Sequence, residues 1–267
     1  MKKAFTLIEL LLVFAIIGLL SALVLVGVKT SKEKSKIAAS KQFGANINHA
    51  LGADAVGVWT FDNVGANVPD DSGNGLTGTI HGSPDVVDGI IRKALYFDGS
   101  SDYIQIDNET AFDNIADFTY SAWIKSDNPS GGWNTIIDLC SDEKDWCDYQ
   151  QFAVSSRKIA VYVYSDSPYC YYSNSFGSID TNWHHVAWTK SIGNYKVYID
   201  GKEVGSGVPD PNCVGFDVGW AQIGASGGEN FAGTIDELGF YKRALTSAEV
   251  YRIYAEGAER RGLAVEQ

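Results

Sequence analysis

The chain has 267 residues, of which 45% are apolar and 20% are charged, and its formal net charge is −12. This balance excludes a fully disordered or collagen-like chain, and the acidic charge argues against nucleic-acid binding by a basic surface. Its 28 glycines, 14 tyrosines and 7 tryptophans against 1 methionine favour a sheet protein with many turns.

An uncharged, apolar segment lies near the start of the chain. Residues 10–28 contain no charged side chain, and only one serine and two glycines interrupt the apolar run. As a helix it would be roughly 28 Å long, close to the hydrocarbon thickness of a bilayer. Lys2 and Lys3 precede it. We therefore predict one transmembrane helix, with a cleaved secretory signal peptide as the alternative.

A carboxylate precedes this run, inside the hexapeptide FTLIEL of residues 5–10. Glu9 would lie at membrane depth, where an unpaired charge is unfavourable. The hexapeptide, its short basic leader and the apolar helix resemble the N-terminus of type IV pilins and type II secretion pseudopilins. This resemblance implies that a prepilin peptidase removes residues 1–4 by cutting between Ala4 and Phe5, and that the new amine is methylated. The family usually has glycine before the cut, where this chain has Ala4.

The same resemblance gives Glu9 a partner. In such filaments the glutamate of one subunit pairs with the N-terminal amine of its neighbour, here that of Phe5. Pairing relieves two buried charges together and fixes the register between subunits. The alternative is that Glu9 reaches the membrane interface as a lone polar residue. We expect Phe5 and Glu9 to direct assembly.

The helical pattern continues beyond the membrane run. From residue 29 onward, apolar residues recur at three- and four-residue spacing, and lysines mark the opposite side. We predict one long N-terminal α-helix over residues 5–53, transmembrane at 10–28 and amphipathic afterwards. A head over residues 54–257 follows, and a flexible tail over 258–267 ends the chain.

In the head, the apolar period changes to two. Residues 118–124 alternate between an apolar and a polar face, and similar runs recur between turns such as the hairpin signal Asp200-Gly201. Roughly a dozen short strands without intervening helices predict an all-β head, an antiparallel β-sandwich or jelly roll. Only residues 246–256 have a helical pattern, and they begin with a capping box at Thr246.

The order of motifs in the head resembles laminin-G-like jelly rolls of the concanavalin A-like type. The motifs are GVWTFD (57–62), DSGNG (71–75), ALYFDGSSDYI (94–104), FTYSAWI (118–124), WHHVA (183–187) and GTIDEL (233–238). The resemblance implies two curved antiparallel sheets with the first and last strands adjacent. It implies no single function, because the fold hosts lectins, adhesins, peptide binders and some hydrolases.

Two polar pairs suggest chemistry, but strand alternation separates their members. His184 and His185 would point to opposite faces and could not share a metal ion. Asp236 and Glu237 likewise could not flank one glycosidic bond. The sequence contains no nucleophile elbow, phosphate loop or zinc-protease motif. We therefore expect a head that is not an enzyme.

Aromatic residues gather in two segments of unusual composition, which we predict to be loops. One segment carries Trp133 and Trp146, and the other carries Tyr169, Tyr171 and Tyr172. Such rings can stack on sugars, so we predict a glycan or a surface protein as the ligand. The alternative for each ring is an ordinary place in the core or in a hairpin pair.

All four cysteines lie in the head. After export an even number of cysteines implies disulfides, whereas a zinc site would favour a C-x-x-C pair that is absent. Three pairings are possible. The short separation of Cys140 and Cys147 favours their pairing, which leaves Cys170 with Cys213.

The laminin-G resemblance also suggests a structural calcium ion. In such domains a calcium often lies where an acidic loop meets the Ile-Asp-Glu strand near the end of the chain. On this sequence the resemblance assigns Asp71 and Asn74 from the loop and Asp236 from the strand, with carbonyl groups near Asp98. Oxygen ligands suit calcium. The alternative is that residues 70–75 form only a turn.

Together these features predict a structural subunit of a type IV pilus-like filament that displays a laminin-G-like binding head. The alternative is a pseudopilin of a type II secretion or DNA-uptake machine, without an external ligand. A monomeric membrane-anchored lectin is a third hypothesis. The implied partners are other pilin subunits, the prepilin peptidase, the membrane before assembly, and a glycan or surface protein. The chain would span the cytoplasmic membrane once, head outside, and then enter an extracellular filament.

Overall fold

The computed structural model describes residues 7–8, 10–12, 14, 51–141, 148–166 and 169–263, and the chain divides into two compact units, 1–48 and 49–267. In the first unit the described residues are helical. None of the helices within the described residues combines the length and the hydropathy that crossing a bilayer requires. The predicted cleavage site at Ala4 and Phe5, Glu9 and most of the predicted membrane run lie outside the described residues.

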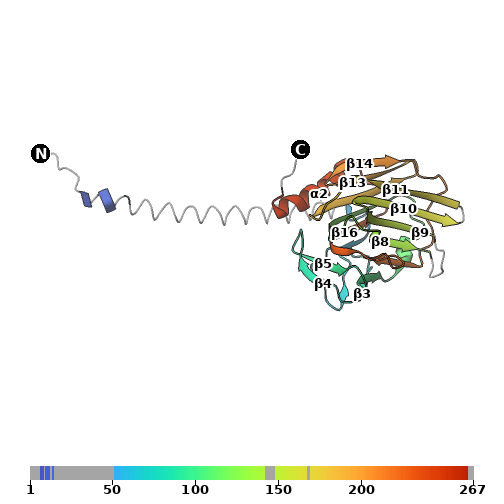
Figure 1. Ribbon diagram of the computed structural model, residues 1–267, viewed down its shortest axis with the longest axis horizontal. Coiled ribbons are helices and arrows are strands. Elements are labelled where there is room, and N and C mark those ends of the chain that lie inside the picture. The colour runs from blue at the N-terminus through green and yellow to red at the C-terminus, as the bar shows by residue number, and fades with distance from the viewer. Residues whose placement is uncertain are drawn as a thin grey trace. The chain divides into compact units, whose positions relative to one another are not determined.

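The second unit is built from two eight-stranded antiparallel sheets (Figure 1). Sheet A consists of β1 (Ala55–Trp59), β4 (Asp85–Asp88), β5 (Lys93–Asp98), β7 (Phe118–Ser126), β12 (His184–Ser191), β13 (Asn194–Ile199), β14 (Lys202–Gly207) and β16 (Ala232–Tyr241). Sheet B consists of β2 (Asn67–Val68), β3 (Gly78–His81), β6 (Tyr103–Ile106), β8 (Asn134–Cys140), β9 (Tyr149–Ser155), β10 (Lys158–Asp166), β11 (Tyr169–Phe176) and β15 (Trp220–Ile223).

The strand order is that of a sandwich of two open sheets. Sheet A runs β14-β13-β12-β7-β16-β5-β4 with β1 also on β16, and sheet B runs β11-β10-β9-β8-β15-β6-β3-β2. The first strand pairs with the last, since Val58 lies opposite Gly239 and Trp59 opposite Leu238. This adjacency is the one that the laminin-G resemblance implied.

The core lies between the two sheets and follows the predicted period of two. On β7, Phe118, Tyr120 and Ile124 enter the core. Trp123, on the same strand, faces the other side of sheet A and packs in a separate cluster with Ala258. Alternation therefore gives each central strand one face for the sandwich core and one for whatever covers the sheet.

The C-terminal helix α2 (Ser247–Arg261) covers part of the outer face of sheet A. Thr246 caps it, and the predicted capping box with Glu249 is present. The prediction that a tail begins at residue 258 was wrong, because the helix continues to Arg261. Gly257 does not end the helix. A Cβ there would lie 2.4 Å from Trp123 Nε1, so glycine allows α2 to approach the sheet closely.

The two aromatic segments predicted as loops contain strands: the first contains β8, and the second belongs to β11. The predicted disulfide Cys170–Cys213 is present and joins β11 to the segment before β15, across 43 residues. In the chain-entropy model such a loop contributes about 4 kcal/mol to stability. Cys140 is also disulfide-bonded, and the fourth cysteine, Cys147, lies outside the described residues.

Candidate functional site

The outer face of sheet B carries an unusual set of aromatic side chains where β9, β10 and β11 lie side by side (Figure 1). On these strands Phe152, Val161 and Val163 enter the core. The alternate residues therefore lie on the outer face. We use the name tyrosine face for Trp133, Tyr149, Tyr162, Tyr164, Tyr169 and Tyr171.

Strand register brings these rings together. Tyr164 lies directly across the strands from both Tyr149 and Tyr171. The rings of Tyr149 and Tyr162 stack, with centroids 4.7 Å apart and planes at 3°. Tyr171 meets Tyr162 edge-on at 5.5 Å, and Trp133 meets it edge-on at 6.1 Å. The result is one contiguous aromatic surface.

Three of the five aromatic residues that the sequence predicted as ligand contacts belong to this face. They are Trp133, Tyr169 and Tyr171; Tyr169 is 62% exposed and Tyr171 is 47% exposed. The prediction for Tyr172 was wrong. It is only 7% exposed and stacks on Tyr195 at 5.0 Å, because neighbouring residues of a strand point to opposite faces. Trp146 lies outside the described residues.

Sequence reasoning missed Tyr149, Tyr162 and Tyr164. A signal for the last two was available, because they alternate with the apolar residues Val161 and Val163. The register that places Tyr149 beside them is not visible in a local pattern.

Four carboxyl groups, which we name the acidic rim, border the tyrosine face: Asp138, Asp148, Asp166 and Glu229. Asp138 lies across the strands from Gln151. The Gln151 Nε2 group donates to Glu229 Oε2 at 2.8 Å. At the other end, the Tyr164 hydroxyl donates to Asp166, and the Asp166 backbone N–H donates to Asp148 Oδ1 at 2.7 Å.

One member of the acidic rim, Asp138, is buried. Asp138 is 2% exposed, and its Oδ1 has no hydrogen-bond partner within the described part of the chain. Burial raises the pKa of Asp138 well above its usual value, although a hydrogen bond from Ser226 acts in the opposite direction. Asp138 is thus the buried member of the acidic rim, whereas Glu229 is exposed.

Two tyrosines of the face, Tyr149 and Tyr164, have raised pKa values and keep their protons. Burial raises the pKa of Tyr149, and its neighbour Tyr162 and the charges of the acidic rim raise it further. The hydrogen bond to Asp166 raises the pKa of Tyr164 to about 12. The face thus presents neutral rings beside carboxylates.

The predicted calcium ligands of the acidic loop hold that loop against β1. Asp71 Oδ2 accepts from Thr60 N–H at 3.2 Å and from Thr60 Oγ1 at 2.7 Å. The Asn74 Nδ2 group donates to the carbonyl oxygens of Ala55 at 2.8 Å and Val56 at 3.0 Å. Both residues therefore stabilise the turn through these hydrogen bonds.

The third predicted ligand, Asp236, is buried and accepts three backbone hydrogen bonds. Its Oδ2 accepts from Ile90 N–H at 2.7 Å and Ile91 N–H at 3.1 Å, and its Oδ1 accepts from Glu237 N–H at 2.8 Å. Among the described residues, no three acidic, histidine or cysteine side chains are grouped as metal ligands. Asp236 itself thus makes the link between distant segments that we expected from an ion, and calcium binding stays a prediction.

The histidine pair has structural partners. His184 Nδ1 lies 2.8 Å from Asp200 Oδ2, and its Nε2 lies 3.1 Å from Asp180 Oδ1. His185 is buried on the other face, with Nε2 2.9 Å from Ser121 Oγ. The two rings point apart, as alternation predicts, and each belongs to a different hydrogen-bonded group.

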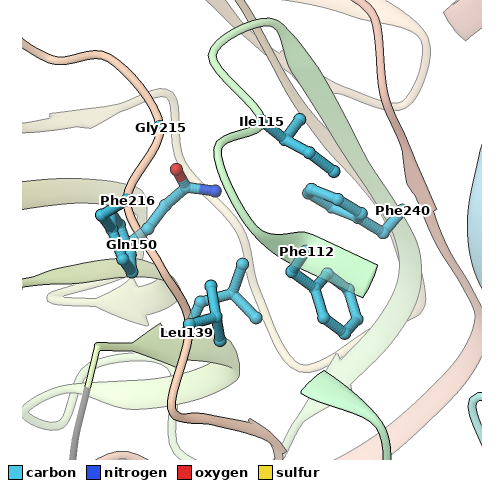
Figure 2. Close-up of a pocket in the computed structure, with 8 residues that line it drawn as sticks. Phe112, Ile115, Leu139, Gln150, Gly215, Phe216 and Phe240 are labelled. Carbon is cyan, nitrogen blue, oxygen red and sulfur yellow. The ribbon is translucent and has the colours of Figure 1, made fainter. Parts of the chain in front are cut away.

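A narrow crevice inside the head offers an alternative site. Figure 2 shows Phe112, Leu139, Phe216 and Phe240 around it, with the Gln150 amide as its polar lining group. The space holds about one water molecule. Because Gln150 donates to the Tyr120 hydroxyl at 2.6 Å, the crevice is part of the packed core. The tyrosine face is therefore the stronger candidate.

Comparison with known families identifies two parts of the chain. The profile of the concanavalin A-like lectin/glucanases superfamily matches residues 98–251. The profile of the prokaryotic N-terminal methylation motif matches residues 1–25. None of the curated proteins matches this chain.

Several solved structures share the fold of the head. Domain 4 of AbnA, an extracellular GH43 arabinanase of Geobacillus stearothermophilus solved with arabinotriose, is 25% identical with a TM-score of 0.61; the match covers 75% of this chain and 98% of that one. The binding domain of Paraclostridial Mosquitocidal Protein 1 is 16% identical with a TM-score of 0.62, and the match covers 76% of this chain and 52% of that one. This chain therefore spans about half the length of the mosquitocidal domain.

The superfamily profile covers more than half of the chain, and it falls on strands of both sheets. The paired first and last strands and the shared core agree with it. The chain carries a prepilin-type methylation motif at its N-terminus, and it belongs to the concanavalin A-like lectin/glucanases superfamily.

Proposed function

We propose that this chain is a pilin-like filament subunit whose head binds a glycan on the tyrosine face. The methylation motif at residues 1–25 supports cleavage before Phe5, export and membrane anchoring. Glu9 and the new Phe5 amine would then join neighbouring subunits. The head would bind its ligand without changing it.

The tyrosine face is the observation that carries the binding role. Contiguous aromatic rings give an apolar platform for the C–H faces of sugars, while nearby carboxyl and amide groups can hydrogen-bond hydroxyl groups. Glu229, which is exposed and accepts from Gln151, supplies such a group beside the Tyr149–Tyr162 stack. The arabinanase domain with the same fold, solved with arabinotriose, also supports an oligosaccharide ligand.

Glycan binding can be tested with the full-length chain in detergent micelles on a glycan array. We expect Tyr162→Ala to weaken binding by about tenfold or more, because this ring contacts three others of the face. Tyr103→Ala is the matched control, since Tyr103 lies on β6, far along the same sheet. Unchanged binding by Tyr162→Ala would contradict the proposed site.

The filament role needs a separate experiment. We expect N-terminal sequencing of the mature protein to begin at Phe5, and electron microscopy of tagged cells to show long surface fibres. Glu9→Ala should be processed normally but assemble poorly. Processed protein without fibres would instead favour the pseudopilin alternative.

A further inference from the structure

Among the described residues, the charged side chains next to the tyrosine face are those of the acidic rim. Asp148 and Asp166 lie at one end and Glu229 lies beside the Tyr149–Tyr162 stack. Within the described residues, none of these carboxylates forms an ion pair with lysine or arginine. Lys158 is the basic residue that shares the outer face of β10, about 13 Å along the strand from Tyr162.

We propose that the tyrosine face selects oligosaccharides that carry protonated amino groups, such as oligomers of glucosamine. This inference rests on the glycan-binding function proposed above and names the class of glycan. A protonated amine is attracted both by carboxylates and by the negative faces of aromatic rings. A carboxylated sugar would be repelled by the same surface.

The length of the tyrosine face favours an oligosaccharide over a single sugar. Tyr149, Tyr164 and Tyr171 form one row across three strands. Two inter-strand spacings separate the ends of this row, about 10 Å, which exceeds the width of one sugar ring. Carboxylates lie beside two members of the row, since Asp148 precedes Tyr149 in the chain and Asp166 accepts from the Tyr164 hydroxyl, so more than one amino group of a ligand would find an acidic neighbour.

The buried end of the acidic rim is built as a polar site. Gln151 Nε2 donates at 2.8 Å both to Glu229 and to Thr135 Oγ1, which fixes the direction of the Glu229 carboxylate. Asp138 lies opposite Gln151, and its buried Oδ1 has no hydrogen-bond partner among the described residues. A ligand amine or hydroxyl group on the outer face would meet the exposed Glu229 carboxylate, which Gln151 holds in place.

The test compares two sugars that differ only in charge. Isothermal titration of the full-length chain in detergent uses the β-1,4-linked tetramer of glucosamine and the N-acetylated tetramer, at a pH where the amines are protonated. We expect the amine form to bind about tenfold more tightly. Higher salt should reduce this preference, because screening shortens the range of the carboxylate charges.

Two isosteric variants test which carboxylates cause the preference for the amine form. Glu229→Gln keeps an oxygen that can accept from Gln151, and Asp166→Asn keeps one that can accept from Tyr164. Each should lower the affinity for the amine form severalfold more than the affinity for the N-acetylated form. Asp85→Asn on β4, exposed and in the other sheet, is the matched control and should change neither.

Three results would overturn the inference. The first is equal or tighter binding of the N-acetylated tetramer; if Tyr162→Ala abolishes that binding, the proposed glycan function stands while the preference for amines fails. The second is equally tight binding of an oligolysine peptide with the same number of charges, which would show attraction by charge alone. The third is failure of both tetramers to bind when the glycan array identifies another ligand.

Discussion

The substitution Asp236→Asn tests the buried hydrogen bonds that Asp236 accepts. The buried carboxylate joins residues 90–91 to β16 through two hydrogen bonds and also binds its own neighbour. Asparagine keeps one acceptor oxygen but places an NH₂ group where the carboxylate accepts amide hydrogens. At least one buried N–H then faces another donor. An unsatisfied buried donor costs about 1–3 kcal/mol, and a charge-assisted hydrogen bond contributes about 1.5–3 kcal/mol.

We therefore expect Asp236→Asn to lower the free energy of unfolding by about 3 kcal/mol. In a domain of this size the melting temperature would fall by about 6–12 °C. Burial raises the pKa of Asp236 to about 7, against the effect of the three amides. Ionisation therefore lowers the stability of the wild type as the pH rises from about 4 to 7, and the loss caused by the variant should be larger at about pH 5 than at about pH 8. Tryptophan fluorescence reports on the head alone, because all seven tryptophans follow residue 58.

The control variant and the test for calcium binding use the same melting experiment. Asp85→Asn removes an exposed carboxylate of β4 and should change stability by less than about 0.5 kcal/mol. A variant at Asp236 as stable as the wild type would refute the reasoning. Repeating both melts with calcium and with chelator tests the predicted ion. Saturating calcium would add roughly 2.7 kcal/mol to the wild type at a hundredfold excess over Kd, and a melting temperature indifferent to chelator would contradict it.

Three further predictions concern packing, the disulfide and the histidines. Gly257→Val should destabilise the head by about 2 kcal/mol in urea titrations, because the new side chain would clash with Trp123, whereas Gly65→Val, with open space around it, serves as the control. Replacing Cys170 and Cys213 by serine should remove about 4 kcal/mol and lower the melting temperature by on the order of 10 °C in calorimetry; no change would show that the disulfide constrains little. Burial lowers the pKa of His185 to about 4, so stability should fall by up to about 3 kcal/mol as the pH drops from about 6.5 to 4. An NMR titration midpoint for His185 near the usual value would contradict its buried, neutral state.

Local alternation was enough to predict the sandwich. Residues 118–124 have a period of two, and their apolar members do enter the core. The pairing of β1 with β16 came from the order of motifs, since it joins segments far apart in the sequence. The helical pattern predicted over residues 246–256 falls short of the end of α2, and the close approach of Trp123 explains the glycine at position 257 inside the helix.

The tyrosine face was predicted only in part for a similar reason. Composition identifies the aromatic segments around Trp133 and Tyr171, but it predicts loops where the structure has strands. As a strand, β11 sends Tyr171 outward and Tyr172 inward. Register between neighbouring strands then places Tyr149 on Tyr162, and that register depends on pairing between strands.

The position of the rings on strands has a consequence for binding. Loops that carry ligand contacts lose conformational freedom when they close on a ligand, and this loss weakens affinity. Here β10 hydrogen-bonds to strands on both sides, and the disulfide at Cys170 fixes β11 at the edge. The stacked pair Tyr149–Tyr162 also restricts both rings before a ligand arrives. A surface ordered in this way suits a repeating ligand, since equally spaced strands can meet equally spaced sugars without rearranging the sheet.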